Sequence, residues 1–349
     1  MKLNHFTIWI VSCFLLFACD KTPQVSTNMS ETFYLQNNGA DMPVFVRGNG
    51  EPKVFILLLH GGPGDGALKY SNHTFSNLLE EQYAMVYWDQ RHQGNSHGHL
   101  KNENITVDNM VEDTYALVKV LKERYGDDIS LFLMGHSWGG LLGTSFMVKE
   151  DYQNEINGWI ESGGAHDFPL MNQEIIKRFQ EIAPVEIAAK NHAEEWNEVL
   201  EFVNSIDTSA ISNEEITLLN EYAGKCENLI TSLNDKSQSE LSELKLIFLN
   251  ADNPFTVINN EFFLPESFYL EIVSTSLTND LHKITTPTLL CWGRYDFKVP
   301  YQLGQSALEK ISTPDKFLKI YENAGHSSMR YEPQQFASDV IEFIELYKN

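Results

Sequence analysis

Cysteine is scarce in this chain, with four residues among 349. Cys13 and Cys19 lie near the N-terminus, which leaves Cys226 and Cys291 for the body of the protein. These two are far apart in sequence and lack the spacing of metal ligands, so neither a zinc motif nor a disulfide framework is expected. Cys291 lies in an apolar run, and we expect a buried, unreactive thiol there.

The N-terminal apolar run is too short to cross a membrane. It extends from Phe6 to Ala18, or 13 residues, whereas a spanning helix needs about 20. With Lys2 before it, the run is typical of a secretory signal peptide. Its end, Leu16-Phe17-Ala18-Cys19, resembles the lipobox of bacterial lipoproteins, in which the cysteine is acylated.

This N-terminus predicts a location and a membrane partner. We expect residues 1–18 to be a signal peptide, Cys19 to carry lipid, and the polar segment 19–30 to be a tether. The protein would then be held on a membrane of the bacterial cell envelope by its lipid. The alternative is a plain signal peptide cut after Ala18, followed by secretion.

Positive charge is also limited: 25 Lys and Arg residues face 48 Asp and Glu residues, for a net charge of −23. Such a chain repels phosphates, so we expect no nucleic-acid partner. The acidic balance suits solubility and is compatible with cationic or neutral small substrates.

Short apolar runs alternate with helical patterns along most of the chain. The runs lie at 53–59, 83–88, 129–134, 158–163, 286–293 and 317–322, and two alternating segments at 32–36 and 42–48 precede them as a hairpin. The stretch 107–125 is a predicted helix, with Thr106 as its cap and Gly126 at its end. This alternation predicts an α/β fold with a mostly parallel central sheet flanked by helices.

The alternation stops between residues 168 and 281. This segment has helical apolar spacing and many acidic residues, and we expect it to be a helical cap inserted over the ends of the strands. The catalytic domain would then consist of residues 31–167 and 282–349. We find no internal repeat.

One hydroxyl lies between glycines at the junction of a predicted strand and a predicted helix. The sequence "GHSWG" at 135–139 has the G-x-S-x-G pattern of a strand–turn–helix elbow, which exposes a serine above the carboxyl edge of a sheet. A serine becomes a nucleophile only when a base removes its proton. Ser137 is therefore a candidate nucleophile that requires a base and an acid elsewhere.

Two downstream residues fit those roles. Asp296 follows the predicted strand 286–293, and His326 follows the strand 317–322, in the order serine, acid, histidine that this scaffold uses. Both would lie at the edge of the sheet where α/β proteins bind ligands. The nearest alternative acid, Asp315, precedes a strand and would lie at the opposite edge.

The sequence also offers an anion-stabilising loop. "HGGPG" at 60–64 follows a predicted buried strand, and its glycines allow backbone N–H groups to approach a ligand closely. We assign one donor to the Gly62 amide and the other to the amide of Trp138, the residue after the nucleophile. His60 is interpreted as a structural residue that anchors this loop.

Together these motifs resemble a known family. "HGGPG" (60–64), "WDQRHQGNS" (88–96), "GHSWGG" (135–140), "GRYD" (293–296) and "GH" (325–326) are similar to the α/β-hydrolase fold, and more narrowly to its proline iminopeptidase branch. The resemblance implies a Ser137–Asp296–His326 triad, a helical cap, and release of an N-terminal residue from small peptides without metal or organic cofactor.

Two features depart from that branch. His92 stands where family members usually have glycine, and we interpret Arg91 and Asp89 as a structural pair. The branch binds the substrate amine through cap glutamates, but no cap acid here lies in an alignable motif. The most acidic cap positions are therefore interpreted as a solvated helix face; they are Glu194, Glu195, Glu198, Glu214 and Glu215.

Three functions remain open at this point. The first is an aminopeptidase that acts through an acyl-enzyme, and the second is an esterase or lipase with the same machinery. The third is a non-catalytic binding lipoprotein of the cell envelope, which the intact serine, acid and histidine disfavour.

Overall fold

The computed structural model describes residues 25–98, 101–230 and 264–349. The expected signal segment, Cys19 and half of the expected tether lie outside these residues, so those expectations remain predictions. Within the described ranges, every helix is too short or too polar to cross a bilayer.

A mixed sheet forms the centre of the molecule. Its strands are β1 (Met29–Asn37), β2 (Ala40–Gly48), β3 (Val54–Leu59), β4 (Ala84–Trp88), β5 (His97–Gly98), β6 (Ser130–His136), β7 (Gly158–Ser162), β8 (Thr288–Gly293) and β9 (Lys316–Tyr321). The order across the sheet is β1-β2-β4-β3-β6-β7-β8-β9, with β5 beside β2. The pairs from β4 to β9 are parallel, whereas β1 and β2 form an antiparallel hairpin at one edge.

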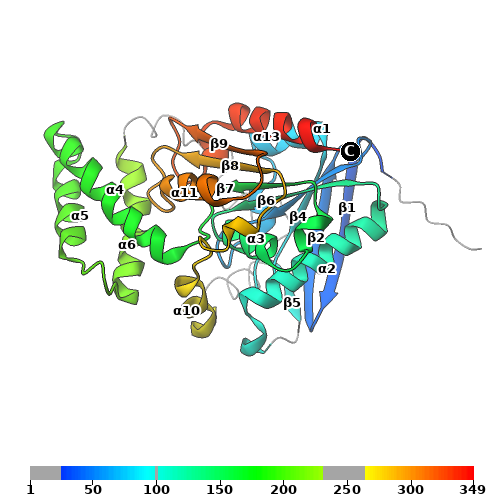
Figure 1. The fold of residues 1–349 in the computed structure, drawn as a ribbon, viewed down its shortest axis with the longest axis horizontal. Coiled ribbons are helices and arrows are strands. Elements are labelled where there is room, and N and C mark those ends of the chain that lie inside the picture. The colour runs from blue at the N-terminus through cyan, green and yellow to red at the C-terminus, as the bar shows by residue number, and fades with distance from the viewer. Residues whose placement is uncertain (1–24, 99–100, 231–263) are drawn as a thin grey trace, which may run out of the picture.

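Helices cover both faces of this sheet. They are α1 (Thr74–Gln82), α2 (Val107–Tyr125), α3 (Trp138–Val148), α11 (Gln302–Lys310), α12 (Ser328–Tyr331) and α13 (Pro333–Tyr347). In Figure 1, α1 and α13 lie on one side of the sheet and α2 and α3 on the other. The predicted α/β fold with a mostly parallel sheet is confirmed.

The buried strand β3 shows why the apolar runs are continuous. Its six side chains are all buried, and alternate residues belong to two separate cores. Val54, Ile56 and Leu58 pack with residues of α1 and α13. The residues between them pack with α2 and α3 on the other face. A strand covered on both faces has no polar side, as the sequence pattern requires.

A group of helices is inserted between β7 and β8. It contains α4 (Phe168–Ala188), α5 (Ala193–Ser205), α6 (Asn213–Leu229) and α10 (Glu266–Ser274). In Figure 1, α4, α5 and α6 stand beside the sheet, away from β1 and α2. They occupy the region for which a helical cap is expected. We call α4, α5, α6 and α10 the cap helices below.

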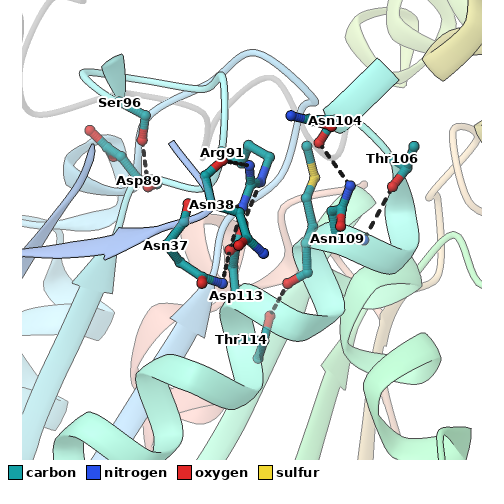
Figure 2. A network of polar contacts seen from close by, with 11 residues as sticks. Asn37, Asn38, Asp89, Arg91, Ser96, Asn104, Thr106, Asn109, Asp113 and Thr114 are labelled. Carbon is teal, nitrogen blue, oxygen red and sulfur yellow. Dashed lines mark hydrogen bonds and ion pairs between the residues drawn. The ribbon is translucent and has the colours of Figure 1, made fainter. Parts of the chain in front are cut away.

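The proposed Arg91–Asp89 pair is wrong. The Arg91 guanidinium instead donates from Nε and Nη2 to the two carboxylate oxygens of Asp113, at 2.7 and 2.6 Å, and both side chains are fully buried (Figure 2). Asp89 accepts the backbone N–H groups of Ala67 and Asn95. The correct partner lies on α2, where sequence proximity to Arg91 could not reveal it.

Candidate active site

Ser137 occupies a strained turn between β6 and α3. Its backbone has φ 56° and ψ −119°, a region that residues with a Cβ rarely adopt. Four backbone hydrogen bonds hold this turn: Ser137 donates to the carbonyl of Ser162, and Gly140, Leu141 and Ala165 donate to the carbonyl of Ser137. The turn places Ser137 at the carboxyl edge of the sheet, as the G-x-S-x-G pattern predicts.

The glycine after this turn is required by close packing of helix and sheet. A Cβ on Gly139 would lie 1.9 Å from the carbonyl oxygen of Leu59 in β3. A Cβ on Gly135 would lie 2.3 Å from the carbonyl oxygen of Gly139 itself. The two glycines therefore allow α3 to begin directly against the strands that flank the serine.

Asp296 and His326 are brought together from two loops. The loop after β8 carries Asp296, and the loop after β9 carries His326. The Nδ1 atom of His326 lies 2.9 Å from Oδ2 of Asp296. The other oxygen, Oδ1, accepts the N–H of Val299 at 2.7 Å. The carboxylate is fully buried and the imidazole side chain is 12% exposed, so solvent competes little for this contact.

Ser137 shares a cavity with His326. Both residues line a hollow of about 680 Å³ that lies between the loops carrying Ser137 and His326 and the cap helices. Within the described residues, the Ser137 hydroxyl has no hydrogen bond, including none to His326. Catalytic hydrogen bonds are often long without substrate and tighten in the complex. The structure thus joins the acid to the base and places the serine in their cavity.

Burial shifts the pKa of both members of this pair. Burial, and then the positive charge of Lys298, lowers the pKa of His326 below its usual value. Burial also raises the pKa of Asp296, and this is opposed by the N–H groups of Val299 and Lys298. A lowered histidine pKa keeps the imidazole neutral near physiological pH, which is the form a general base needs.

A cap residue that the sequence did not single out supports both loops. Glu227, near the end of α6, accepts the backbone N–H of His326 at 3.0 Å and that of Phe297 at 3.4 Å through Oε1. Burial, followed by the charge of Asp296, raises the pKa of Glu227 to about 8. Glu227 therefore joins the cap helices to the two loops that carry the acid and the base.

His136 and Tyr70 form a second support that the sequence did not reveal. The Gly61 N–H donates to the Tyr70 hydroxyl at 2.9 Å, and that hydroxyl lies 2.7 Å from Nδ1 of His136. Nε2 of His136 lies 3.1 Å from the carbonyl oxygen of His326. Only Nε2 faces a pure acceptor, so Nε2 carries the proton and Tyr70 donates to Nδ1. We call this chain of contacts, from Gly61 to His326, the Tyr70–His136 relay.

The glycine loop has the N–H groups expected of an anion site. A Cβ on Gly61 would lie 3.3 Å from the Cβ of Ser137, so this loop passes beside the serine. The Gly64 N–H is committed to the Gln93 side chain and the Gly61 N–H to Tyr70. The Gly62 N–H has no such partner in the described part of the chain. Trp138 is the first residue of α3, so its N–H has no intrahelical acceptor. The oxyanion assignment remains a prediction.

Residues 89–91 ("DQR") support the glycine loop through hydrogen bonds of Gln90. The Gln90 side chain donates to the carbonyl of His60 and accepts the indole N–H of Trp138 at 2.7 Å. His60 is fully buried, and burial lowers its pKa to about 4, which fits a structural role. His92 has φ 54°, a conformation that favours glycine, which explains why glycine is usual at this position in the family it resembles.

The cap acids expected on a solvated face do not line the cavity. The five glutamates at 194, 195, 198, 214 and 215 are all partly or fully exposed, and none contributes to the lining. Among the described residues, Asp65 is the one carboxylate that does, and it pairs with Lys69 at 2.5 Å. Most of the cap-side lining is apolar, including Met171, Phe268 and Ile272.

The other metal-ligating and thiol side chains of the described residues form no metal site and no disulfide. Within the described ranges, no three His, Cys, Asp or Glu residues are arranged to hold a metal ion. Cys226 and Cys291 are free and buried, and burial raises the pKa of each thiol to about 12. The predicted burial of Cys291 is confirmed, and its raised pKa agrees with the expectation of an unreactive thiol.

Comparison with known proteins agrees with this architecture. The family described as "Serine aminopeptidase, S33" matches residues 50–215. The proline iminopeptidase of Thermoplasma volcanium is 26% identical over 299 residues, which cover 84% of this chain and 89% of that enzyme. The proline iminopeptidase of Saccharolobus solfataricus is 25% identical over 227 residues; the match spans 64% of each chain.

Solved structures extend the likeness over the described fold. The structure of VinJ has a TM-score of 0.62 at 21% identity, and the match covers 91% of this chain and 99% of VinJ. The chain has the α/β-hydrolase fold. An esterase from Exiguobacterium antarcticum has a TM-score of 0.58 at 17% identity, covering 91% of this chain and 100% of that esterase. At such identities, these structures show a shared fold and nothing more about this chain.

Proposed function

We propose that this protein is a serine hydrolase that cleaves small acyl substrates through a Ser137–His326–Asp296 triad. The observation that carries the proposal is the hydrogen bond of 2.9 Å between His326 and Asp296, beside a cavity that Ser137 also lines. The acid fixes the tautomer of the imidazole, so that Nε2 is left to accept the proton of the serine.

The reaction follows from this arrangement. Ser137 Oγ attacks the acyl carbon while its proton passes to Nε2 of His326. The resulting oxyanion would be bound by the N–H groups of Gly62 and Trp138. His326 then protonates the leaving group, and an acyl-enzyme remains. A water, deprotonated by His326, attacks the ester carbon; as the intermediate collapses, Ser137 Oγ leaves and takes back the proton from His326.

An aminopeptidase of the proline iminopeptidase type is the first candidate for the substrate. Its support is the similarity of this chain to several proline iminopeptidases over most of its length. Such an enzyme would release the N-terminal residue of a short peptide and would need no metal or organic cofactor.

An esterase is the second candidate, and the cavity favours it. A free amine is best held by carboxylates, yet the described lining offers only Asp65, which already pairs with Lys69. The apolar residues on the cap side of the cavity would instead suit an uncharged acyl chain. The two candidates use one catalytic apparatus and differ in what the cap recognises.

Two assays test the proposal. A fluorophosphonate probe should label the wild-type protein and not Ser137→Ala; equal labelling of both, or of neither, would contradict a nucleophilic Ser137. A panel of aminoacyl-naphthylamides set beside p-nitrophenyl esters then separates the candidates. Turnover of the esters alone excludes the aminopeptidase. A wild-type protein that the probe does not label is better described as a binding lipoprotein on a hydrolase scaffold.

We also propose that Cys19 anchors the protein to a membrane of the cell envelope. The support is the lipobox-like sequence that ends in Cys19. Full-length protein expressed in bacteria should enter the detergent phase on Triton X-114 partition, and Cys19→Ala should stay in the aqueous phase. Aqueous partition of both forms would favour a plain signal peptide.

A further inference from the structure

The charged side chains that line the cavity carry a net positive charge, opposite in sign to that of the whole chain. Four of them line it within the described residues: Asp65, Lys69, Lys298 and Arg330. Asp65 and Lys69 form an ion pair at 2.5 Å and cancel each other. The two that remain are both cations, although the chain as a whole carries a net charge of −23.

Lys298 is the more informative of these cations. It lies two residues after Asp296, and its stem passes the cap helix α6, where Cε lies 3.4 Å from the position that a Cβ on Gly224 would take. Its side chain is partly buried, and its ammonium has no hydrogen bond or ion pair among the described residues. Its charge reaches the site, because it lowers the pKa of both His326 and His136.

The neighbouring carboxylates do not neutralise Lys298 by contact. Asp296 gives one oxygen to His326 and the other to the N–H of Val299. Glu227 accepts the N–H groups of His326 and Phe297. Both are buried behind the wall of the cavity and do not line it. A partly desolvated ammonium without a partner gains most from an anion that enters the cavity itself.

Arg330 adds a second positive charge at the rim. Its Nη2 donates to the backbone carbonyl of Lys69 at 3.2 Å, and its guanidinium lies 5.9 Å from the centre of the Tyr70 ring. A carbonyl orients the guanidinium without cancelling its charge. An anionic group in the cavity would therefore meet Lys298 from the side of the cap and Arg330 from the rim.

We propose that Lys298, assisted by Arg330, binds an anionic group of the substrate, so that the preferred substrates carry a carboxylate close to the scissile acyl bond. This inference rests on the proposed hydrolase function and names its substrate class. The carboxylate can belong to the acyl part, as in a dicarboxylic monoester, or to the leaving group, as in the free C-terminus of a dipeptide.

Matched substrates test the proposal and distinguish the two sources. The acyl arm compares p-nitrophenyl hydrogen glutarate with p-nitrophenyl valerate, which has a methyl group in place of the carboxylate. The leaving-group arm compares prolylglycine with prolylglycinamide. We expect kcat/KM to favour the charged member of one pair by about tenfold or more, as for a charge-assisted contact. The arm that shows the preference identifies the source of the carboxylate.

Lys298→Met is the decisive variant. It should lower that ratio about tenfold, measured at about pH 8, where His326 is neutral with or without the lysine charge. Lys310→Met removes an equal charge from an exposed position on α11 outside the cavity lining and should leave the ratio unchanged. Hydrolysis of both members at equal rates, or a ratio that survives Lys298→Met, overturns the proposal while the hydrolase function stands.

A binding measurement keeps the proposal testable if nothing is hydrolysed. Calorimetric titration of Ser137→Ala with glutaranilic acid and with valeranilide compares the same two acyl groups without turnover. Prolylglycine and prolylglycinamide are titrated in the same way. Tighter binding of the charged member, lost in Ser137→Ala/Lys298→Met, supports the anion site even if the catalytic proposal fails. Equal binding in both pairs overturns it.

Discussion

At the scale of single residues, the site depends on a few buried polar contacts that each have one function. The carboxylate of Asp296 divides its oxygens between the His326 ring and the Val299 N–H. The His136 ring divides its nitrogens between Tyr70 and the carbonyl of His326. Because each atom has a fixed partner, small changes should alter the chemistry without altering the fold.

Asp296→Asn tests the orientation of the base. The amide oxygen of asparagine can still accept the Val299 N–H, which turns its NH₂ group toward Nδ1 of His326. The imidazole must then place its proton on Nε2, where it cannot accept one from Ser137. We expect kcat to fall by about 10⁴ with an unchanged melting temperature. Near-normal turnover in a stopped ester assay would mean that another acid orients His326.

Tyr70→Phe tests the relay. Without the hydroxyl, the Gly61 N–H loses its acceptor and Nδ1 of His136 loses its donor, so the glycine loop and the base loop are no longer linked. We expect a decrease in kcat of about tenfold with little change in KM, because the relay positions groups used in the transition state. His136→Gln, which keeps polar atoms at this place, should be less impaired than His136→Ala. Equal losses in kcat for both His136 variants would contradict a positioning role.

At the scale of elements, the packing of α3 against β3 fixes where the nucleophile projects. The crossing is so close that Gly139 has no room for a side chain, whereas Gly224 in α6 meets only the end of the Lys298 stem, at 3.4 Å. Both glycines lie in helices, so comparing an alanine substitution at each position separates the effect of helix propensity from that of steric overlap.

Gly139→Ala should destabilise the fold by about 3 kcal/mol, because the new Cβ would overlap the carbonyl of Leu59 and force α3 away from the sheet. Gly224→Ala should be neutral or stabilise by up to about 1 kcal/mol, since alanine is the better helix former. Urea unfolding monitored by circular dichroism measures both. Similar stabilities for the two variants would contradict the packing argument.

At the scale of the whole molecule, Glu227 connects the cap helices to the two loops that carry Asp296 and His326. It is a buried carboxyl beside Asp296, and burial followed by the charge of Asp296 raises its pKa to about 8 in the folded protein. A carboxyl whose folded pKa is raised stabilises the fold fully below its unfolded pKa of about 4.5, and that stabilisation is lost as the pH rises through the folded pKa.

The melting temperature of the wild type should therefore contain a component that decreases between about pH 5 and pH 8. Glu227→Gln has no proton to lose and keeps an oxygen that can accept the His326 N–H, so this component should be absent. Melting curves across that pH range measure the difference. An unchanged slope in Glu227→Gln would show that Glu227 does not titrate in the folded protein. Glu194→Gln is the control and should keep the slope, because Glu194 is exposed on α5 outside the cavity lining.

Much of this molecule could be predicted from local patterns. Strands buried on both faces require continuous apolar runs. The ends of helix α2 can be predicted from Thr106 and Gly126, which cap it. The bend at Ser137, and the positions of Asp296 and His326 after their strands, follow from chain order at one sheet edge. The supports of the site could not be found in this way: Tyr70 and His136 are 66 residues apart, and Glu227 and His326 are 99 apart.

The sequence by itself therefore determined the α/β architecture, the candidate catalytic residues and the net negative charge, because periodicity, chain order and composition are local or additive properties. The tertiary structure alone decided that Arg91 pairs with Asp113 and that Glu227 hydrogen-bonds to the loops after β8 and β9. It also decided that Lys298 and Arg330 line the cavity without an ion-pair partner among the described residues. A net charge says nothing of where each charge lies. Only folding selects which side chains face a substrate and which cancel one another.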